Sequence, residues 1–127
     1  MSELTEKGRK TRRKVLGDAH VDRAEANTTP LDAAFQAMLT DTAWGHVWSR
    51  GTIPTRERSM ITIALLAGLG NFDELAMHIR ATANSGASQD DVMEALLHVA
   101  AYAGIPRANH AFKIARETFA AMASGNG

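Results

Sequence analysis

The chain has 127 residues, with 14 Lys and Arg against 14 Asp and Glu, and no cysteine. Its length predicts one domain, residues 1–127, and the 45% of hydrophobic residues with only 6% aromatics favours packed helices over a β-sandwich. The missing cysteine excludes disulfides, zinc–thiolate sites and thiol peroxidase chemistry, and the zero net charge provides no general basic field for nucleic acid.

The first expected helix covers residues 4–26 and contains a basic run. Acidic residues are interleaved with this run, which we interpret as a solvated helix face rather than a nucleic-acid site. Gly8 and Gly17 weaken the helix, so residues 1–27 are expected to gain stability from a partner subunit. The basic run consists of Arg9, Lys10, Arg12, Arg13 and Lys14.

Thr28-Thr29-Pro30 predicts the start of a second helix that runs to about Trp48. In it Trp44 and Trp48 lie one turn apart, and we interpret them as core or subunit contacts, with an aromatic wall for a ligand as the alternative. Ile53-Pro54-Thr55 starts the third helix, residues 55–69. This helix is so apolar that we expect it to be the central buried helix.

Asn71 predicts a helix cap for residues 71–85, and Ser88 with Asp91 resembles a capping box that opens a helix through Tyr102. Gly104-Ile105-Pro106 marks the start of the sixth and last helix, and residues 124–127 form a flexible tail. No strand is expected. The longest apolar stretch, residues 60–69, is too short to span a bilayer, and the N-terminus has no apolar signal segment, so we predict a cytoplasmic protein without membrane contact.

Three sets of polar residues lie on apolar helices. Glu57 shares a helix side with Ile61 and Leu65, so we expect it on the core-facing side, where a carboxylate is either paired or functional. Asn71, Glu74 and His78 form one stripe at the rim of the core, where a carboxylate beside an imidazole suits a proton donor. An ordinary exposed Glu–His pair is the alternative. The third set, which we interpret as a structural hydrogen-bond ladder, is Glu94, His98 and Tyr102.

Several cations could hold a substrate carboxylate. Arg56, Arg58 and Arg107 could each clamp it through two hydrogen bonds, and His110 lies near the start of the last helix, where free backbone N–H groups favour an anion. The histidines show no spacing typical of metal ligands, so no metal site is expected.

Four stretches of the sequence carry a common pattern: residues 56–67, 71–81, 86–91 and 102–109. Together they resemble the carboxymuconolactone decarboxylase family, which shares its helical fold with alkylhydroperoxidase D-type proteins. The resemblance covers nearly the whole chain. It implies an all-α helical bundle and assembly into a homo-oligomer, commonly a hexamer. The redox relatives carry Cys-x-x-Cys-x-x-x-His; here the thiol positions fall on Asn71 and Glu74, the histidine on His78, and the relay glutamate at or near Glu57.

The family reaction converts 4-carboxymuconolactone to 3-oxoadipate enol-lactone and CO2 without a cofactor, in aromatic-acid breakdown. The resemblance implies that His78 donates a proton or a hydrogen bond, oriented by Glu74 or Glu57. Arg58, then His110 and Arg107, would anchor the second carboxylate of the dicarboxylate lactone, with Trp44 as a further contact. Two alternatives remain: an enzyme for another acidic lactone, and a non-catalytic helical subunit.

Overall fold

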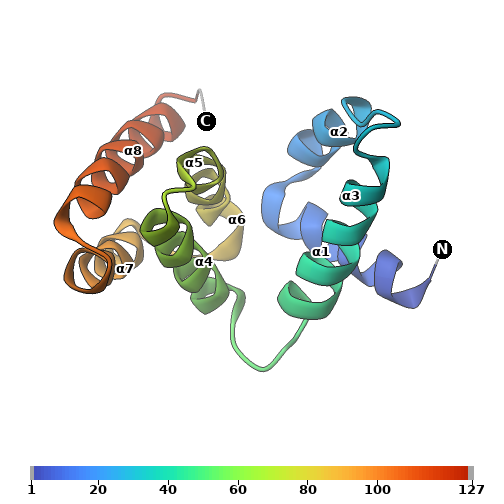
Figure 1. The fold of residues 1–127 in the computed structure, drawn as a ribbon, viewed down its shortest axis with the longest axis horizontal. Coiled ribbons are helices and arrows are strands. Elements are labelled where there is room, and N and C mark those ends of the chain that lie inside the picture. The colour runs from blue at the N-terminus through green and yellow to red at the C-terminus, as the bar shows by residue number, and fades with distance from the viewer. Residues whose placement is uncertain (1, 126–127) are drawn as a thin grey trace. The chain divides into compact units, whose positions relative to one another are not determined.

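The computed structural model describes residues 2–125 and is all-α, as the sequence predicts (Figure 1). Over these residues it contains eight α-helices and one π-helix, and no strand. The predicted number of six helices is therefore wrong, because three of the expected helices divide. The chain forms two compact units, one ending at Pro54 and one beginning at Thr55, and each is described by itself.

The first unit begins with α1 (Glu3–Leu16) and α2 (Asp18–Ala26). They replace the single helix expected over residues 4–26. Gly17 separates them because its φ of 91° is incompatible with a right-handed helix, and its N–H closes α1 on the carbonyl of Arg13 at 2.9 Å. Ion pairs hold the two helices together: Arg13 contacts Asp18, Asp22 and Glu25, and Arg9 contacts Glu25.

The second expected helix also divides, into α3 (Ala33–Leu39) and the π-helix η1 (Thr40–Trp48). α1 and η1 cross at a close contact where each helix contributes a glycine, Gly8 from α1 and Gly45 from η1. A Cβ on Gly8 would collide with the carbonyl oxygen of Thr40, and a Cβ on Gly45 would lie 2.8 Å from the side chain of Leu4. Gly8 therefore permits a close helix contact, which is a structural use that the sequence interpretation of a weakened helix missed.

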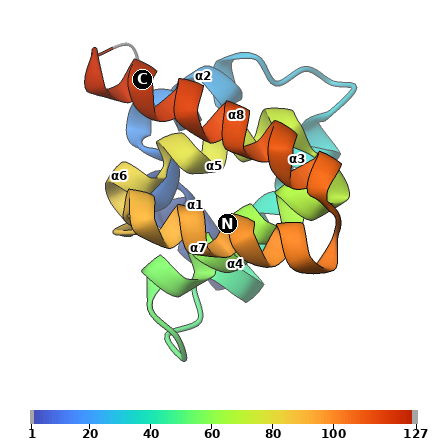
Figure 2. The same cartoon turned by 90° about the vertical axis from the view of Figure 1, so that its left-hand side faces the viewer.

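The second unit contains five helices around one apolar core. They are α4 (Thr55–Leu69), α5 (Phe72–Arg80), α6 (Thr82–Ser85), α7 (Gln89–Tyr102) and α8 (Ile105–Ala123). The helix expected over residues 71–85 is interrupted at Ala81. α8 packs on both α5 and α7, and α4 contacts all four other helices (Figure 2). The core is centred on Ile63, Leu75, Ile79, Leu96 and Ala111, which are fully buried.

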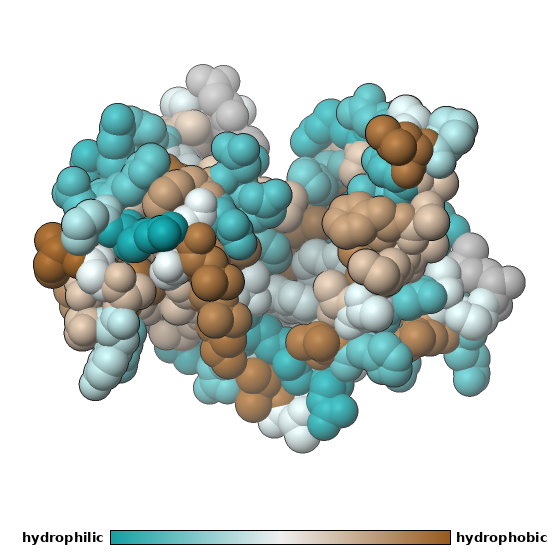
Figure 3. Space-filling view, in the orientation of Figure 1, coloured by the Kyte–Doolittle hydropathy of each residue, from teal (hydrophilic) through white to brown (hydrophobic). Residues whose placement is uncertain are grey.

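α4 is only half buried in this chain, so the prediction of a central buried helix is wrong. Ser59, Ile63 and Ala67 line its buried face, whereas Ile61 and Leu65, on the opposite side, are 52% and 57% exposed. Figure 3 shows apolar side chains gathered over α4. The helix has little polar surface, but the other helices of the second unit leave one of its apolar faces uncovered.

The start of α7 is fixed by the predicted capping box. The Ser88 hydroxyl accepts from the Asp91 N–H at 3.0 Å, and the Asp91 carboxylate accepts from the Ser88 N–H at 2.9 Å. The same carboxylate accepts two hydrogen bonds from Arg56, at 2.7 and 2.6 Å, which connects α4 to α7. These bonds hold the pKa of Asp91 well below its usual range.

Two further predictions concern the C-terminal tail and the absence of a membrane-spanning helix. Ser124 ends α8 in a turn, and residues 126–127 of the predicted flexible tail lie outside the described residues. Within residues 2–125, no helix is long and apolar enough to cross a membrane.

Candidate active site

The predicted stripe of Asn71, Glu74 and His78 lies on α5 and at its N-cap. Its members differ in environment: Asn71 and Glu74 are exposed, whereas the imidazole of His78 is buried, with 6% of its surface exposed. His78 occurs in the last turn of α5, next to the buried Ile79. A buried imidazole is shielded from water, which is an environment in which one proton can be held and delivered at a defined position.

Glu57 and Arg58 lie in the first turn of α4, and both are half-buried. Glu57 shares its side of the helix with Ile61 and Leu65, as predicted, but this side is the exposed apolar face and not the core-facing one. The next residue, Ser59, is 1% exposed, and its hydroxyl has no hydrogen-bond partner within residues 2–125. The first turn of α4 therefore presents a carboxylate, a guanidinium and a buried hydroxyl in consecutive positions.

Arg107 and His110 lie in the first turns of α8, against the turn that joins α4 to α5. The guanidinium of Arg107 occupies the position that a Cβ on Gly70 would take, and Gly70 itself has a φ of 78°. The ring of His110 stacks on Phe72, with ring centroids 4.0 Å apart. Both side chains are exposed, so this cluster presents a guanidinium and an imidazole at the surface.

The structure divides the predicted substrate-binding residues into groups that are far apart. Arg58 is at the beginning of α4 and Gly70 follows its end, so the helical rise separates them by about 18 Å along the axis. A small dicarboxylate is shorter than this distance between the backbone of Arg58 and the position of the Arg107 guanidinium. Within one chain, the predicted anchor residues therefore do not form a single site.

Two other candidates have structural contacts of their own. Trp44 belongs to the first unit, where it is buried and lies against Trp48 with ring centroids 5.1 Å apart. The interpretation of the two tryptophans as packed residues agrees with this geometry. Arg56 is engaged in its double hydrogen bond to Asp91, and this contact raises the pKa of the guanidinium. Arg56 therefore serves to join helices.

No metal centre is suggested by the geometry. Within residues 2–125, no group of three or more His, Asp or Glu side chains lies close enough to hold a metal ion.

Glu94, His98 and Tyr102 all lie on α7, where His98 and Tyr102 stack with ring centroids 6.3 Å apart. Both side chains are exposed, so this set lies at the surface.

Comparison with known proteins places the chain in the family that the sequence resembles. Residues 33–117 match the model of the carboxymuconolactone decarboxylase family. The chain is 44% identical over 112 residues to a 4-carboxymuconolactone decarboxylase of Acinetobacter baylyi, covering 88% of this chain and 84% of that protein. It is 36% identical over 115 residues to a nitrosuccinic acid decarboxylase of Metarhizium robertsii, covering 91% of this chain and 80% of that protein.

The chain therefore belongs to the carboxymuconolactone decarboxylase family, and the resemblance stated from its sequence is confirmed. The matched region spans α3 to most of α8, so it contains both the first turn of α4 and the buried His78. Both similar proteins are decarboxylases, which agrees with the predicted carboxy-lyase class.

Sequence reasoning missed two polar features of the second unit. The first is the buried hydroxyl of Ser59, which gave no signal because serine is common on both helix faces. The second is a set of hydrogen-bond donors on α8 that line one cavity: the cations Lys113 and Arg116 and the imidazole of His110. Their spacing of three residues was a usable signal, because it places all three on neighbouring turns of a helix.

Proposed function

We propose that this chain is a cofactor-independent carboxy-lyase that converts 4-carboxymuconolactone to 3-oxoadipate enol-lactone and CO2. The observation that carries this proposal is the 44% identity to a protein of that name over 88% of the chain. The buried His78 on α5 supports it, because the position matches the family histidine and suits the delivery of one proton.

The reaction needs an electron acceptor and one proton. The bond between the ring carbon and the departing carboxylate breaks, CO2 leaves, and the electron pair enters the conjugated lactone as an extended enolate. One proton then adds to carbon and restores a neutral lactone. The protein must stabilise the enolate with hydrogen-bond donors and must supply that proton. An apolar environment around the departing carboxylate favours the loss of its charge.

We assign the proton or the hydrogen bond to His78, with Glu57 or Glu74 as the carboxylate that orients the imidazole in the reaction. Arg58 is the anchor for the second carboxylate, because it lies beside Glu57 in the first turn of α4. Arg107 and His110 lie on α8, and the Arg107 guanidinium lies at Gly70, about 18 Å along the α4 axis from Arg58, so we expect them to contact the same substrate from a neighbouring copy.

A second copy of the chain is the proposed partner, in a homo-oligomer that we expect to be a hexamer. The support is the apolar face of α4 and α7, which the other helices of the second unit leave uncovered and which includes Ile61, Leu65 and Leu97. Because Glu57 shares this side of α4, a second copy packed here would also exclude water from the glutamate. We place the oligomer in the cytoplasm, with no nucleic-acid partner.

This assembly is tested by sedimentation of Leu65→Glu. A buried carboxylate in the interface is expected to reduce the oligomer to smaller species, whereas Arg80→Glu, at an exposed position of α5, is expected to sediment like the parent protein. An unchanged oligomer in Leu65→Glu would refute the assignment of this face.

Nitrosuccinic acid is the alternative substrate, because the second decarboxylase relative is named for it. Its chemistry places the same demands on a site: a carboxylate leaves, the nitro group takes the electron pair, and a proton returns to carbon. Nitrosuccinic acid also has a second carboxylate to be anchored. The higher identity to the lactone decarboxylase makes the lactone the first choice.

The deciding experiment measures CO2 release by chelator-treated protein from freshly prepared 4-carboxymuconolactone and, in parallel, from nitrosuccinate. Turnover of the lactone supports the proposal, and preference for nitrosuccinate selects the alternative. His78→Ala is expected to reduce kcat by about 10²–10⁴-fold, the usual contribution of a proton donor. His78→Gln keeps the volume and tests the same point if the alanine variant folds poorly. Asp73→Asn, exposed on the same helix, is the control and should retain full turnover.

A further inference from the structure

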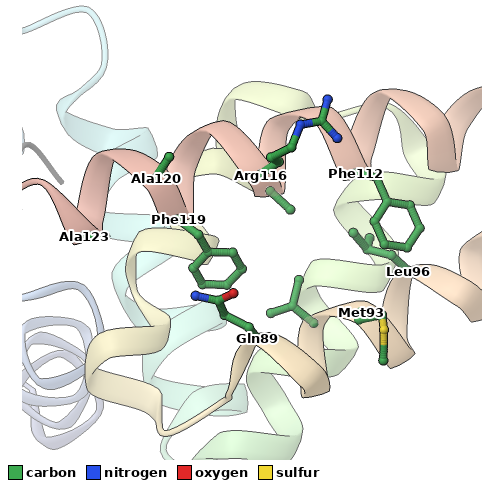
Figure 4. Close-up of a pocket in the computed structure, with 10 residues that line it drawn as sticks. Gln89, Met93, Leu96, Phe112, Arg116, Phe119, Ala120 and Ala123 are labelled. Carbon is green, nitrogen blue, oxygen red and sulfur yellow. The ribbon is translucent and has the colours of Figure 1, made fainter.

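A cavity of about 450 Å³ lies between α7 and α8 in the second unit. Its walls are mainly apolar. Figure 4 shows Phe119 reaching from α8 toward the side chain of Gln89 and Phe112 lying beside Leu96. Val92, Leu96 and Ala115 provide buried surface within it. A volume of this size is typical of pockets that hold small organic molecules.

A second cavity of about 500 Å³ adjoins the first, because Phe112 and Arg116 line both. Its remaining walls come from Asn109, His110 and Lys113, so its polar side chains are hydrogen-bond donors and include no carboxylate. In Figure 4 the guanidinium of Arg116 points away from the α7 side of the apolar cavity. The cationic groups therefore border the apolar cavity and do not occupy it.

Lys113 and Arg116 in this second cavity lack, within residues 2–125, the acidic partners that Arg9, Arg13 and Arg56 have. Arg13 and Arg56 form ion pairs with aspartates, whereas Lys113 and Arg116 form no ion pair within residues 2–125. Glu117 lies four residues after Lys113, where helix geometry would allow a pair, but the structure has none. An anionic ligand would be the first counter-charge for these two side chains.

We propose that the paired cavities on α7 and α8 bind an aromatic carboxylate, with its ring in the apolar cavity and its carboxylate on Arg116 and Lys113. Two phenylalanines and buried aliphatic side chains suit a flat apolar body, and an arginine suits the two oxygens of a carboxylate. Neither His78 nor Glu57 lines these cavities, and the ligand carboxylate is assigned to Arg116 and Lys113, which have no part in the proposed reaction; His110, proposed above to contact the lactone from a neighbouring copy, borders the second cavity.

The test uses 2-naphthoate as the probe, with 2-naphthalenemethanol as its uncharged counterpart. Calorimetry measures affinity, and NMR of the labelled full-length protein locates the binding. Saturable binding of naphthoate is expected, with shifts concentrated on α7 and α8. The double variant Lys113→Gln/Arg116→Gln should weaken naphthoate by at least about tenfold and leave the alcohol unchanged. Ala120→Phe, at an exposed position of the cavity rim, should weaken both probes.

The matched control is Lys10→Gln/Arg80→Gln, which removes the same two charges from exposed positions outside both cavities. It should bind naphthoate as the parent protein does. An equal loss in this control, the absence of saturable binding at millimolar naphthoate, or NMR shifts confined to α4 would each overturn the proposal. His78→Gln should bind naphthoate normally, which separates failure of this site from failure of the decarboxylase assignment.

Discussion

Replacing Gly8 with alanine should destabilise the first unit, although alanine is the better helix former. In an exposed helix the exchange gains up to about 1 kcal/mol. At Gly8 the new methyl group meets the backbone of η1: it would collide with the carbonyl oxygen of Thr40 and lie 3.0 Å from the N–H nitrogen of Gly45. Both neighbours are main-chain atoms, which cannot move aside as a flexible side chain does.

The expected magnitude follows from these two effects. Overpacking of a close contact costs about 1–3 kcal/mol, and rigid backbone places Gly8 at the upper end of this range. After the gain in helix propensity, the free energy of unfolding should fall by about 1–2 kcal/mol. For a unit of this size, each kcal/mol corresponds to roughly 4–8 °C in Tm.

Tryptophan fluorescence during urea unfolding is the assay, because Trp44 and Trp48, the two tryptophans of the chain, both lie in the first unit. The matched control is Gly68→Ala on α4, where a new Cβ has only an ordinary contact at 3.5 Å, with Ala103. That variant should be neutral or gain up to about 1 kcal/mol. A fluorescence midpoint for Gly8→Ala equal to or above that of the parent would refute the close crossing of α1 and η1.

The remaining predictions concern the second unit. Leu75→Ala, at a fully buried position, should lower the free energy of unfolding by about 2–5 kcal/mol in urea titrations followed by circular dichroism, and a loss below 1 kcal/mol would contradict its place in the core. Gly70→Ala should lower Tm by calorimetry, because the methyl group needs the space of the Arg107 guanidinium and the residue has a positive φ; an unchanged Tm would count against this contact. Asp91→Asn should have a lower Tm than the parent protein, and this difference in Tm should be the same at every pH from 5 to 8. The pKa of Asp91 is depressed by Arg56, so its stabilisation is complete above about pH 4, the unfolded value, and the difference between the proteins should shrink as pH falls below it. A Tm difference between Asp91→Asn and the parent that grows as the pH falls below about 4 would contradict the stabilising ion pair of Asp91 with Arg56.

Local sequence signals predicted most helix limits in the second unit. The expected helix over 55–69 is observed with those bounds, and the capping box from Ser88 to Asp91 forms as predicted. These features depend on neighbouring residues alone, since a cap or a stop is made within one turn. The division of the expected helices was not predicted, because glycine at position 17 is compatible with both a helix and a helix break. No local sequence pattern predicts the π-helix of residues 40–48.

The composition and the motif residues by themselves determined the fold class, the absence of thiol chemistry and the family to which the chain belongs. Only the tertiary structure decided which side of each helix is buried. The sequence predicts that the apolar residues Ile61 and Leu65, which share a helix side with Glu57, face the core, yet both are exposed, because periodicity identifies a stripe but not what covers it. The sequence also did not predict the distance between Arg58 and Arg107. Both carry the same charge and suit the same ligand, but the guanidinium of Arg107 lies at Gly70, so the length of α4 separates it from the position of Arg58.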